Sequence, residues 1–403
     1  MPEVSASPIP IQSAGARPRL ESVDLLRGLA IVIMALDHVR DFFSHDLLYF
    51  SPTDLTKTSA ALFLTRWITH FCAPVFCFLA GTGAFLSFGR GKTKSDLAKF
   101  LITRGLWLVF LELTFVRFAW TFSLGFSENA GVIWMLGWSM VALAALIYLP
   151  VWAIATFGIL MIAGHNFFDP IAPETFGSFG WLWKVLHVGA PIHIAPHMEF
   201  FVLYPLIPWI GVMAAGYSFG VIVKQDRARR RKKLFLIGGG LTAAFILIRA
   251  ANIYGDPDPW STQANPLFTF FSFLNCEKYP PSLSYLLMTL GPAIVLLGLL
   301  DHDLGRFWRP LIVFGRVPLF FYILHLYLIH ALALLISYLR HRGPGGLWFG
   351  PIFHYPALFP PNYGFGVGGI YALCLLVVLL LYPLCRWFAD LKQRKRDVWL
   401  SYL

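Results

Sequence analysis

Charged residues are scarce in this chain of 403 residues: they make up 13% of it, whereas a soluble domain usually carries about 25%. Hydrophobic residues make up 57%, and the mean hydropathy is +0.66. So little charge is not enough to cover a soluble globule of this size. The composition therefore argues against a soluble enzyme and predicts an all-α, polytopic integral membrane protein.

Cysteine is also scarce, and its pattern argues against two classes of site. There are five cysteines, an odd number, and none stands in a CxxC pair. Four of them lie inside apolar runs. A disulfide framework and a zinc site both need cysteines in other patterns. Neither is predicted, and no metal is expected.

Several motifs of soluble enzymes are missing or broken. The sequence holds no HExxH, and Leu86 stands where a phosphate-binding loop ending at Gly91-Lys92-Thr93 would need its first glycine. The GxSxG string at 216–220 closes an apolar run and runs into a basic segment. A nucleophile elbow needs a strand before it and a helix after it, so none is predicted. We find no internal repeat and no sign of nucleic-acid binding.

Long apolar runs are what the chain has in place of these motifs. A helix needs roughly 20 mostly apolar residues to cross a bilayer. About ten runs meet this requirement, and the fourth and fifth are separated only by Pro150. They span residues 24–44, 61–86, 98–121, 131–149, 151–167, 198–223, 234–253, 282–300, 311–338 and 366–389.

Basic residues predict the orientation of these runs. With the N-terminus in the cytoplasm, 23 of the 32 Lys and Arg residues fall on the inner side and six on the outer side, in keeping with the positive-inside rule. Both termini are therefore expected in the cytoplasm of a cell whose inner membrane holds the protein. This bias also accounts for the net charge of +11. We divide the chain into a disordered polar tail (1–20), one transmembrane domain (21–390) and a basic tail (391–403).

Three predicted outer loops, residues 168–197, 254–281 and 339–365, are long, rich in Pro, Gly and aromatic residues, and poor in charge. Long loops of this kind are more often functional than decorative. They could cap an outward-facing pocket or could be loose connectors. The sequence leaves both interpretations open.

The first apolar run carries an unusual set of polar residues. On a helix of 3.6 residues per turn, Asp24, Arg27, His38, Asp41 and His45 share one face. Arg27 and His38 are eleven residues apart, or about 16 Å along the axis. Charge in hydrocarbon is costly, so this stripe is expected to face a protein interior or a wet cavity. The alternative is a helix whose charged ends sit at the two membrane interfaces.

This stripe offers two kinds of chemistry. The planar guanidinium of Arg27, near the cytoplasmic face, is suited to binding a phosphate. His38 lies further across the membrane and is a candidate general base for a hydroxyl or amine nucleophile. Asp41, three residues on, is expected to fix the tautomer and orientation of that histidine.

Other ionisable residues lie in or next to the remaining runs. A single histidine in an apolar helix is more often a packed structural residue than a catalytic one. The number of such residues nevertheless favours a shared polar cavity. The additional candidates are Asp37, His70, Arg104, Glu199, Arg249, Lys278, Arg316 and His325.

One segment, RLESVDLLRGLAIVIMALDHVRDFF from Arg19 to Phe43, resembles the opening of the heparan-alpha-glucosaminide N-acetyltransferase catalytic-domain family, in its bacterial branch. The spacing from Arg27 to His38 also resembles the arginine–histidine signature of the related type-3 membrane acyltransferases. Three further stretches match in order, so the resemblance runs from residue 19 to about 390. They are HFCAPVFCFLAG (70–81), EKYPPSLSYLLMTLGP (277–292) and GRVPLFFYILHLYLIH (315–330).

This resemblance implies a membrane enzyme of ten or eleven helices that moves an acyl group from cytosolic acyl-CoA to an acceptor, often a sugar, on the far side. It implies that His38 is the catalytic histidine, that Arg27 lies at the acyl-CoA end, and that Arg104 is a second arginine there. In the lysosomal enzyme the catalytic histidine lies further along, at a position that could correspond to His45. The choice between His38 and His45 stays open.

We therefore predict an acyl-CoA-dependent O- or N-acyltransferase, with acetyl-CoA as co-substrate and a glycan or lipid-linked sugar as acceptor. The alternative is a proton-coupled transporter or exporter of an anionic or acylated solute, which also uses intramembrane ionisable residues but often has repeated halves. Whether the chain forms a homodimer is left open. The predicted site comprises His38, Asp41, His45, His70 and Asp37 for catalysis, Arg27, Arg104 and Arg316 for the donor, and Glu199, Arg249, Lys278 and His325 for the acceptor.

Overall fold

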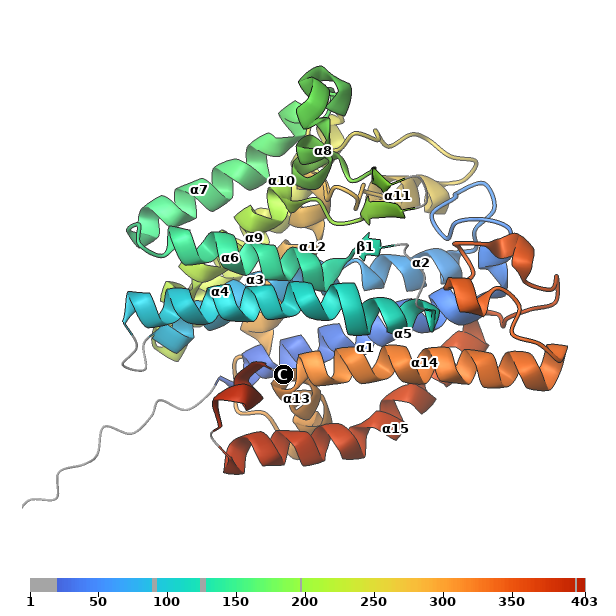
Figure 1. The fold of residues 1–403 in the computed structure, drawn as a ribbon. Helices are drawn as coiled ribbons and strands as arrows, with labels where there is room; N and C mark the ends of the chain where they lie inside the picture. Colours follow the sequence, from blue (N-terminus) through green and yellow to red (C-terminus); the bar gives the residue numbers. More distant parts are fainter. Residues whose placement is uncertain (1–19, 89–92, 124–127, 196–197, 396, 403) are drawn as a thin grey trace, which may run out of the picture.

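The computed structural model describes residues 20–88, 93–123, 128–195, 198–395 and 397–402. Within these ranges the chain is mostly helical, and its long helices run side by side in a bundle (Figure 1). The predicted disordered tail, apart from its last residue, lies outside the described residues. The predicted basic tail begins inside a helix, because the last long helix continues to Arg394.

The elements are numbered along the chain, and short 3₁₀ or π turns join several of them. The strands are β1 (Glu128–Ala130), β2 (Pro191–Ala195) and β3 (Met198–Val202). The helices are α1 (Glu21–Phe43), α2 (Ala60–Thr69), α3 (Cys72–Phe88), α4 (Lys94–Leu111), α5 (Arg117–Thr121), α6 (Val132–Leu146), α7 (Val151–Gly164), α8 (Gly180–Trp183), α9 (Leu206–Val223), α10 (Arg227–Ala251), α11 (Pro266–Leu274), α12 (Leu283–Leu299), α13 (Arg309–Arg316), α14 (Pro318–His341) and α15 (Val367–Arg394).

Six helical segments of the described chain are long and apolar enough to cross a membrane: α2 with α3, α7 extended to Phe168, α9, α10, α14 and α15. Helices α6 and α12 are apolar but shorter. Helix α1 carries more charge, yet most of its residues are buried inside the bundle. The chain is therefore a multi-pass helical membrane protein. Each of the ten predicted runs overlaps one or two of its helices.

The sixth predicted run begins in a strand and not in a helix. Strand β3 pairs in parallel with β1 and in antiparallel fashion with β2. Helix α9 starts only after Pro205. The residue before a proline is pushed toward extended backbone, and proline fits the start of a helix but not its interior. The helix therefore cannot extend back through this position, and the predicted all-α class includes a small three-stranded sheet.

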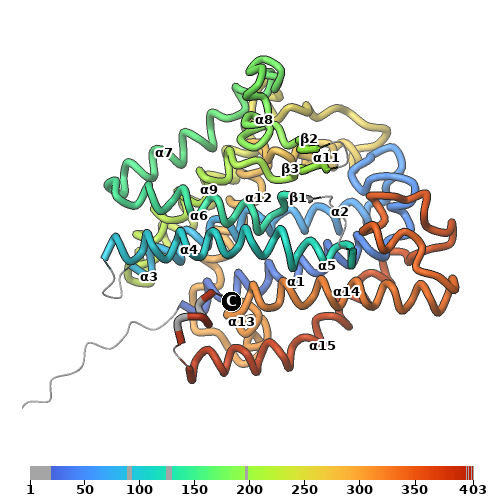
Figure 2. The backbone as a smooth tube through the Cα atoms, in the orientation of Figure 1, coloured from blue at the N-terminus to red at the C-terminus, as the bar shows by residue number. Residues whose placement is uncertain are grey.

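The two ends of the bundle differ in character. The start of α1 and the C-terminal residues lie at the same end (Figure 2). We call this the basic end, and it comprises residues 20–27, 93–104, 224–234, 300–316, 390–395 and 397–402. We call the opposite end the loop end, and it comprises residues 44–59, 165–195, 198–205, 252–282 and 342–366.

At the loop end, residues 339–365 pack onto the C-terminus of α1. The N–H of Ile352 donates to the carbonyl of Asp41 at 3.1 Å, and the N–H of Phe365 donates to the carbonyl of Phe43 at 2.7 Å. The last carbonyls of a helix have no partners within it, so this segment satisfies groups that α1 leaves open. This segment is therefore anchored to the end of α1, which a loose connector would not be.

Two glycines fix the opposite end of α1. Gly28 of α1 and Gly315 of α13 face each other so closely that a Cβ on either would collide with the opposing backbone. Small residues let helix backbones approach in this way. The contact brings the guanidinium of the adjacent Arg27 to 3.1 Å from the Gly315 carbonyl, so Arg27 is held against α13.

Candidate active site

His38 of α1 contacts a histidine from the far half of the chain. Its Nδ1 lies 2.8 Å from Nε2 of His325 on α14, and the two rings are nearly parallel, with centroids 5.0 Å apart. The Trp120 ring packs edge-on against His38, with centroids 4.9 Å apart. Both histidines are buried. Helices α1 and α14 thus place two imidazoles side by side inside the bundle.

The hydrogen bonds of this pair define its tautomers. Nδ1 of His325 lies 3.0 Å from the carbonyl oxygen of Phe321, one turn earlier in α14. A carbonyl only accepts, so Nδ1 of a neutral His325 carries the proton and Nε2 is an acceptor. Nδ1 of His38 then donates to that acceptor, which leaves the lone pair of a neutral His38 on Nε2. Within the described part of the chain, no group hydrogen-bonds to this Nε2.

Asp37, next to His38, is the centre of a buried ion-pair cluster. Its carboxylate lies 2.7 Å from Nη1 of Arg40 and 3.0 Å from Nη1 of Arg66, and it accepts a 2.7 Å hydrogen bond from the Thr69 hydroxyl. Arg66 and Thr69 come from α2, so the cluster ties α2 to α1. A buried carboxylate needs such partners, because burying an isolated charge is costly.

Asp41 contacts Arg40 and not His38, contrary to the expectation from its spacing. Its carboxylate lies 2.6 Å from Nη2 of Arg40. Residues three apart share a helix face, but a guanidinium is a stronger partner for a carboxylate than a neutral imidazole is, because that hydrogen bond is charge-assisted at both ends. The orienting role that the sequence assigned to Asp41 therefore falls to His325 in the structure.

His70 lies at a break between α2 and α3. Pro74 has no N–H group to donate to the carbonyl of His70, four residues earlier, so regular helix is interrupted there. The hydroxyl of Tyr285 on α12 donates to that carbonyl instead, at 2.7 Å. The His70 ring is buried, 5.4 Å from the Tyr285 ring and within range of the charges of Arg66 and Asp37. Because of this break in the helix, His70 lies at the edge of the ion-pair cluster around Asp37.

His45 lies outside α1. The helix ends at Phe43, so His45 does not continue the polar stripe. Its Nδ1 lies 2.8 Å from the backbone carbonyl of Tyr363, and its ring packs against Tyr49. Of the two histidines left open by the sequence, His38 is the one that adjoins the buried charge cluster.

Lys278 and Tyr279 reach the same cluster from the loop before α12. Lys278 is 7% exposed, and its ammonium lies 5.0 Å from the centre of the Tyr279 ring. The Tyr279 hydroxyl is 3.5 Å from that of Tyr204. Burial raises the pKa of the Tyr279 hydroxyl, but the positive charges of Lys278 and Arg66 outweigh burial and hold that pKa below its ordinary value. The electrostatic potential around Tyr279 is therefore positive.

The predicted donor-side arginines gather at the basic end. Nη1 of Arg27 lies 3.1 Å from the carboxylate of Asp24, whose other oxygen lies 3.9 Å from Nε of Arg316. Glu21 is 3.7 Å from Arg316. The charge of Arg27 also acts on Arg104 of α4. Three arginines and two carboxylates thus share this site, and its net positive charge suits an anionic ligand.

The face of α1 between these two sites is closed. Ile31 and Met34, which lie between Arg27 and His38, are 1% and 6% exposed and belong to the hydrophobic core. The stripe expected from the sequence is therefore two polar clusters at the ends of α1, separated by an apolar middle.

One protein family matches the chain over its first half and slightly beyond. The model of the heparan-alpha-glucosaminide N-acetyltransferase catalytic domain matches residues 19–249. This chain belongs to that family. No curated protein matches it. The part that matches the acetyltransferase family contains Arg27, Asp37 and His38, whereas His325 and Lys278 lie beyond it.

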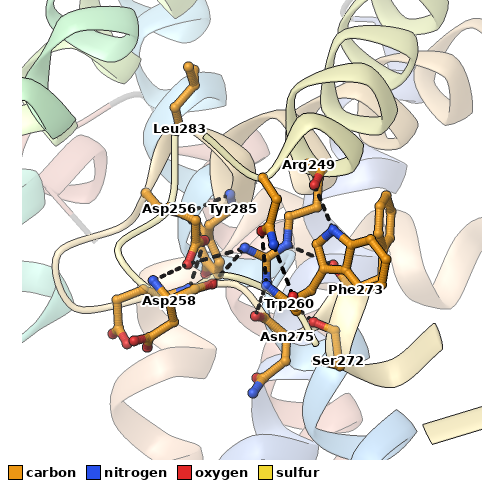
Figure 3. Close-up of polar contacts among 12 residues, drawn as sticks. Arg249, Asp256, Asp258, Trp260, Ser272, Phe273, Asn275, Leu283 and Tyr285 are labelled. Atoms are coloured by element: carbon orange, nitrogen blue, oxygen red, sulfur yellow. Dashed lines mark hydrogen bonds and ion pairs between the residues drawn. The ribbon is translucent and has the colours of Figure 1, made fainter. Parts of the chain in front are cut away.

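In this family member, Arg249 at the end of α10 has a structural role, since it binds neighbouring backbone groups (Figure 3). Its side chain is 2% exposed and lies 3.5 Å from the carboxylate of Asp256. Because its donors bind carbonyls of α11 and of the segments before and after that helix, it fastens this region of the loop end. The four carbonyls belong to Phe273 (3.0 Å), Asp258 (2.8 Å), Ser272 (3.2 Å) and Asn275 (2.8 Å).

This arrangement also positions Lys278. The carboxylate of Asp256 accepts hydrogen bonds from the N–H of Glu277 at 3.1 Å and from the hydroxyl of Ser282 at 2.6 Å. Lys278 lies between these two anchored residues. Arg249, predicted to bind the acceptor, thus acts on the loop that carries Lys278.

Glu199 lies apart from these contacts. It is on β3 and forms a 3.2 Å ion pair with His193 of β2, and both side chains are largely exposed. Among the residues that the structure describes, Glu199 forms no hydrogen bond or ion pair with the residues around His38.

The sequence prediction omits Arg66, Thr69 and Tyr279. A signal for Arg66 is present, since an arginine inside an apolar run requires a partner in the protein interior. Nothing in the sequence says that this partner is Asp37, because the two residues lie 29 positions apart on different helices. Thr69 and Tyr279 are ordinary residues for their segments and give no signal.

Proposed function

We propose that this protein is a membrane-embedded acyltransferase that moves an acetyl group from acetyl-CoA to a hydroxyl or amine of a sugar acceptor. Family membership supports acetyl-CoA as the donor, since enzymes of this family use it. The observation that carries the proposal is the His38–His325 pair, which leaves an unprotonated Nε2 on His38. A buried imidazole in this state is equipped for general base catalysis.

His38 acts on the acceptor. Its Nε2 takes the proton of the acceptor hydroxyl or amine as that oxygen or nitrogen attacks the acetyl carbonyl carbon. The new C–O or C–N bond forms, the C–S bond breaks, and the departing CoA sulfur receives the proton from His38. His325 keeps the ring in the productive tautomer by accepting from Nδ1. The adjacent Asp37 stabilises the positive charge that His38 carries between the two proton transfers.

The donor phosphates bind at the basic end, near Arg27, Arg104 and Arg316. The pantetheine arm then extends along α1 toward His38, about 16 Å away. Because Ile31 and Met34 are packed in the core, binding of the donor requires side chains along this path to move.

Replacing Arg27 by alanine should weaken acetyl-CoA binding about ten- to a hundred-fold, since a charged contact to a phosphate contributes about 1.5–3 kcal/mol. Arg104→Ala should act in the same direction. Isothermal titration calorimetry of the detergent-purified protein with acetyl-CoA measures both effects. Arg306→Ala is the matched control, because this arginine is exposed at the same end. Unchanged affinity in both Arg27→Ala and Arg104→Ala would contradict the donor site.

The proposed orientation places the basic end in the cytoplasm and the loop end outside the inner membrane. The native cysteines are all buried, so an introduced thiol reports its own side. Arg229→Cys should react with an impermeant maleimide only in permeabilised cells, whereas Lys57→Cys should react in intact cells. Both side chains are well exposed, at 82% and 58%. The opposite labelling pattern would reverse the orientation.

An assay of acetyl transfer separates this function from transport. Purified protein in detergent receives labelled acetyl-CoA with and without an added sugar. An acetyltransferase releases CoA only when the acceptor is present and places the label on that acceptor. A proton-coupled transporter does neither. If no neutral, amine-bearing or anionic sugar acquires the label, the proposed function is overturned.

A further inference from the structure

The buried cluster around Asp37 contains more positive than negative charge. Arg40 and Arg66 share the Asp37 carboxylate, and Arg40 also pairs with Asp41. Lys278 adds a third cation, whose charge acts on Asp37. Three cations therefore face two carboxylates in a part of the protein where a charge needs a partner.

Lys278 is the cation that lacks a carboxylate. In the described residues, no Asp or Glu oxygen lies within 4.0 Å of its ammonium. Glu277 does not supply one, because its carboxylate accepts hydrogen bonds from the backbone N–H groups of Lys278 and Tyr279, at 2.9 and 2.7 Å. Because Lys278 is 7% exposed, bulk water compensates for little of its charge. The ammonium contacts the Tyr279 hydroxyl, which is a neutral group, so its charge is not compensated by a carboxylate.

The loop that carries Lys278 is held in place. Asp256 is fixed by Arg249 (Figure 3). It binds the backbone of Glu277 and the hydroxyl of Ser282, on either side of the lysine. The lysine therefore cannot reach bulk solvent by a simple swing of a free loop. A cation kept in a buried position by structure around it is typical of a binding residue.

The surroundings of Lys278 suit a sugar. The Tyr279 ring lies 5.0 Å from its ammonium, and Tyr204 packs edge-on against Tyr279 with ring centroids 5.2 Å apart. These two tyrosines bring aromatic rings and hydroxyl groups, the groups that commonly contact sugars, to the side of the lysine. A chain of contacts joins the lysine to the catalytic base. Asp37, next to His38, lies 3.0 Å from Arg66, and Arg66 contacts the hydroxyl of Tyr279, whose ring lies 5.0 Å from the Lys278 ammonium.

We propose that the acceptor sugar carries an anionic group, a carboxylate or a phosphate, and that Lys278 binds this group beside His38. This inference rests on the acyltransferase function proposed above. The anion supplies the negative charge that the cluster lacks, and Lys278 is then a specificity-determining residue. Its ionic contact holds the sugar while His38 acts on a hydroxyl or amine of the same molecule.

Matched sugars test this preference. Acetyl transfer is measured with glucosamine against glucosamine 6-phosphate, and with glucose against glucuronate. The wild type should use an anionic member of these pairs at least ten-fold more efficiently in kcat/KM, since a charged contact in a buried site contributes at this level. A preference within the glucosamine pair indicates that phosphate is recognised, and a preference within the glucose–glucuronate pair indicates that carboxylate is recognised.

Lys278→Met should remove this preference, because methionine keeps much of the side-chain length and loses the charge. The quantity compared is the ratio of kcat/KM for the anionic sugar to kcat/KM for its neutral partner, and Lys278→Arg should keep this ratio well above one. Lys57→Met is the control for loss of a lysine at the same end, since Lys57 is exposed and paired with Asp54. This control should keep the wild-type preference.

The shift in Tm on ligand addition measures binding at the same site without turnover. Glucosamine 6-phosphate or glucuronate should raise the Tm of the wild type more than the neutral sugars do, and Lys278→Met should abolish this difference. The ligand-free Tm of Lys278→Met should not fall, because no carboxylate loses its partner. Equal shifts for anionic and neutral sugars, or a preference that survives in Lys278→Met, would overturn the anion site. Anion binding through Lys278 without acetyl transfer to any sugar would overturn the proposed function alone.

Discussion

Replacement of His38 by alanine is expected to abolish nearly all acetyl transfer and to leave acetyl-CoA binding intact. Removing a general base typically slows a reaction about 10²–10⁴-fold. The proposed site for the donor phosphates is at the basic end, about 16 Å along α1 from this histidine, so rate and donor affinity should separate. Transfer of labelled acetyl groups measures the first quantity, and calorimetry with acetyl-CoA measures the second.

Two further histidine variants make this result specific. His325→Ala removes the acceptor that holds Nδ1 of His38, so it should lower kcat, but by less than His38→Ala does. His45→Ala should stay near the wild type, because its ring contacts a loop carbonyl outside the cluster. If His45→Ala loses turnover and His38→Ala keeps it, the base is assigned to the wrong histidine. If neither variant changes turnover, the polar residues of α1 are structural.

Replacement of Asp37 by alanine is expected to produce the largest loss of stability. Among the described residues, Asp37 is the carboxylate that pairs with Arg66, and it shares Arg40 with Asp41. Removing one partner of a buried ion pair costs about 3–5 kcal/mol, because the other charge stays buried and uncompensated. The free energy of unfolding, obtained by SDS titration in mixed micelles, measures the loss.

Two comparisons decide whether charge pairing is the cause. Asp54→Ala removes a half-buried carboxylate at the same end, whose lysine partner is exposed, and should lower the free energy of unfolding far less than Asp37→Ala does. The double variant Asp37→Ala/Arg66→Met should recover part of the loss, since it also removes the cation left unpaired. An Asp37→Ala variant as stable as Asp54→Ala would show that the cluster does not contribute to folding.

The fold class was predictable because it depends on local composition. A backbone in lipid must satisfy its own hydrogen bonds, so a long apolar run of this kind forms a helix whatever surrounds it. Each predicted run accordingly overlaps a helix. The prediction failed at 198–202, where β3 pairs with β1 from a distant part of the chain. Such pairing is not a local property.

The difference between local and long-range determinants also applies to the arginines inside apolar runs, which look alike in the sequence. Arg66, Arg117 and Arg249 all lie inside apolar runs. Arg66 completes the cluster around Asp37, whereas Arg249 binds backbone carbonyls within residues 254–281 and acts on the site only through the loop that carries Lys278. The cost of burying a guanidinium predicts that each has partners, but the identity of those partners depends on which elements the fold brings alongside.

The sequence by itself determined that this protein is a helical membrane protein and that Arg27 and His38 on its first helix are candidates for chemistry, because the cost of polar groups in an apolar segment is read directly from that segment. Only the tertiary structure decided how His38 is held. Its partner His325 lies 287 residues away, while the nearby Asp41 is taken by Arg40 and His45 falls beyond the end of the helix. Side-chain pairing depends on the rotation and packing of whole helices against one another, which no local pattern specifies.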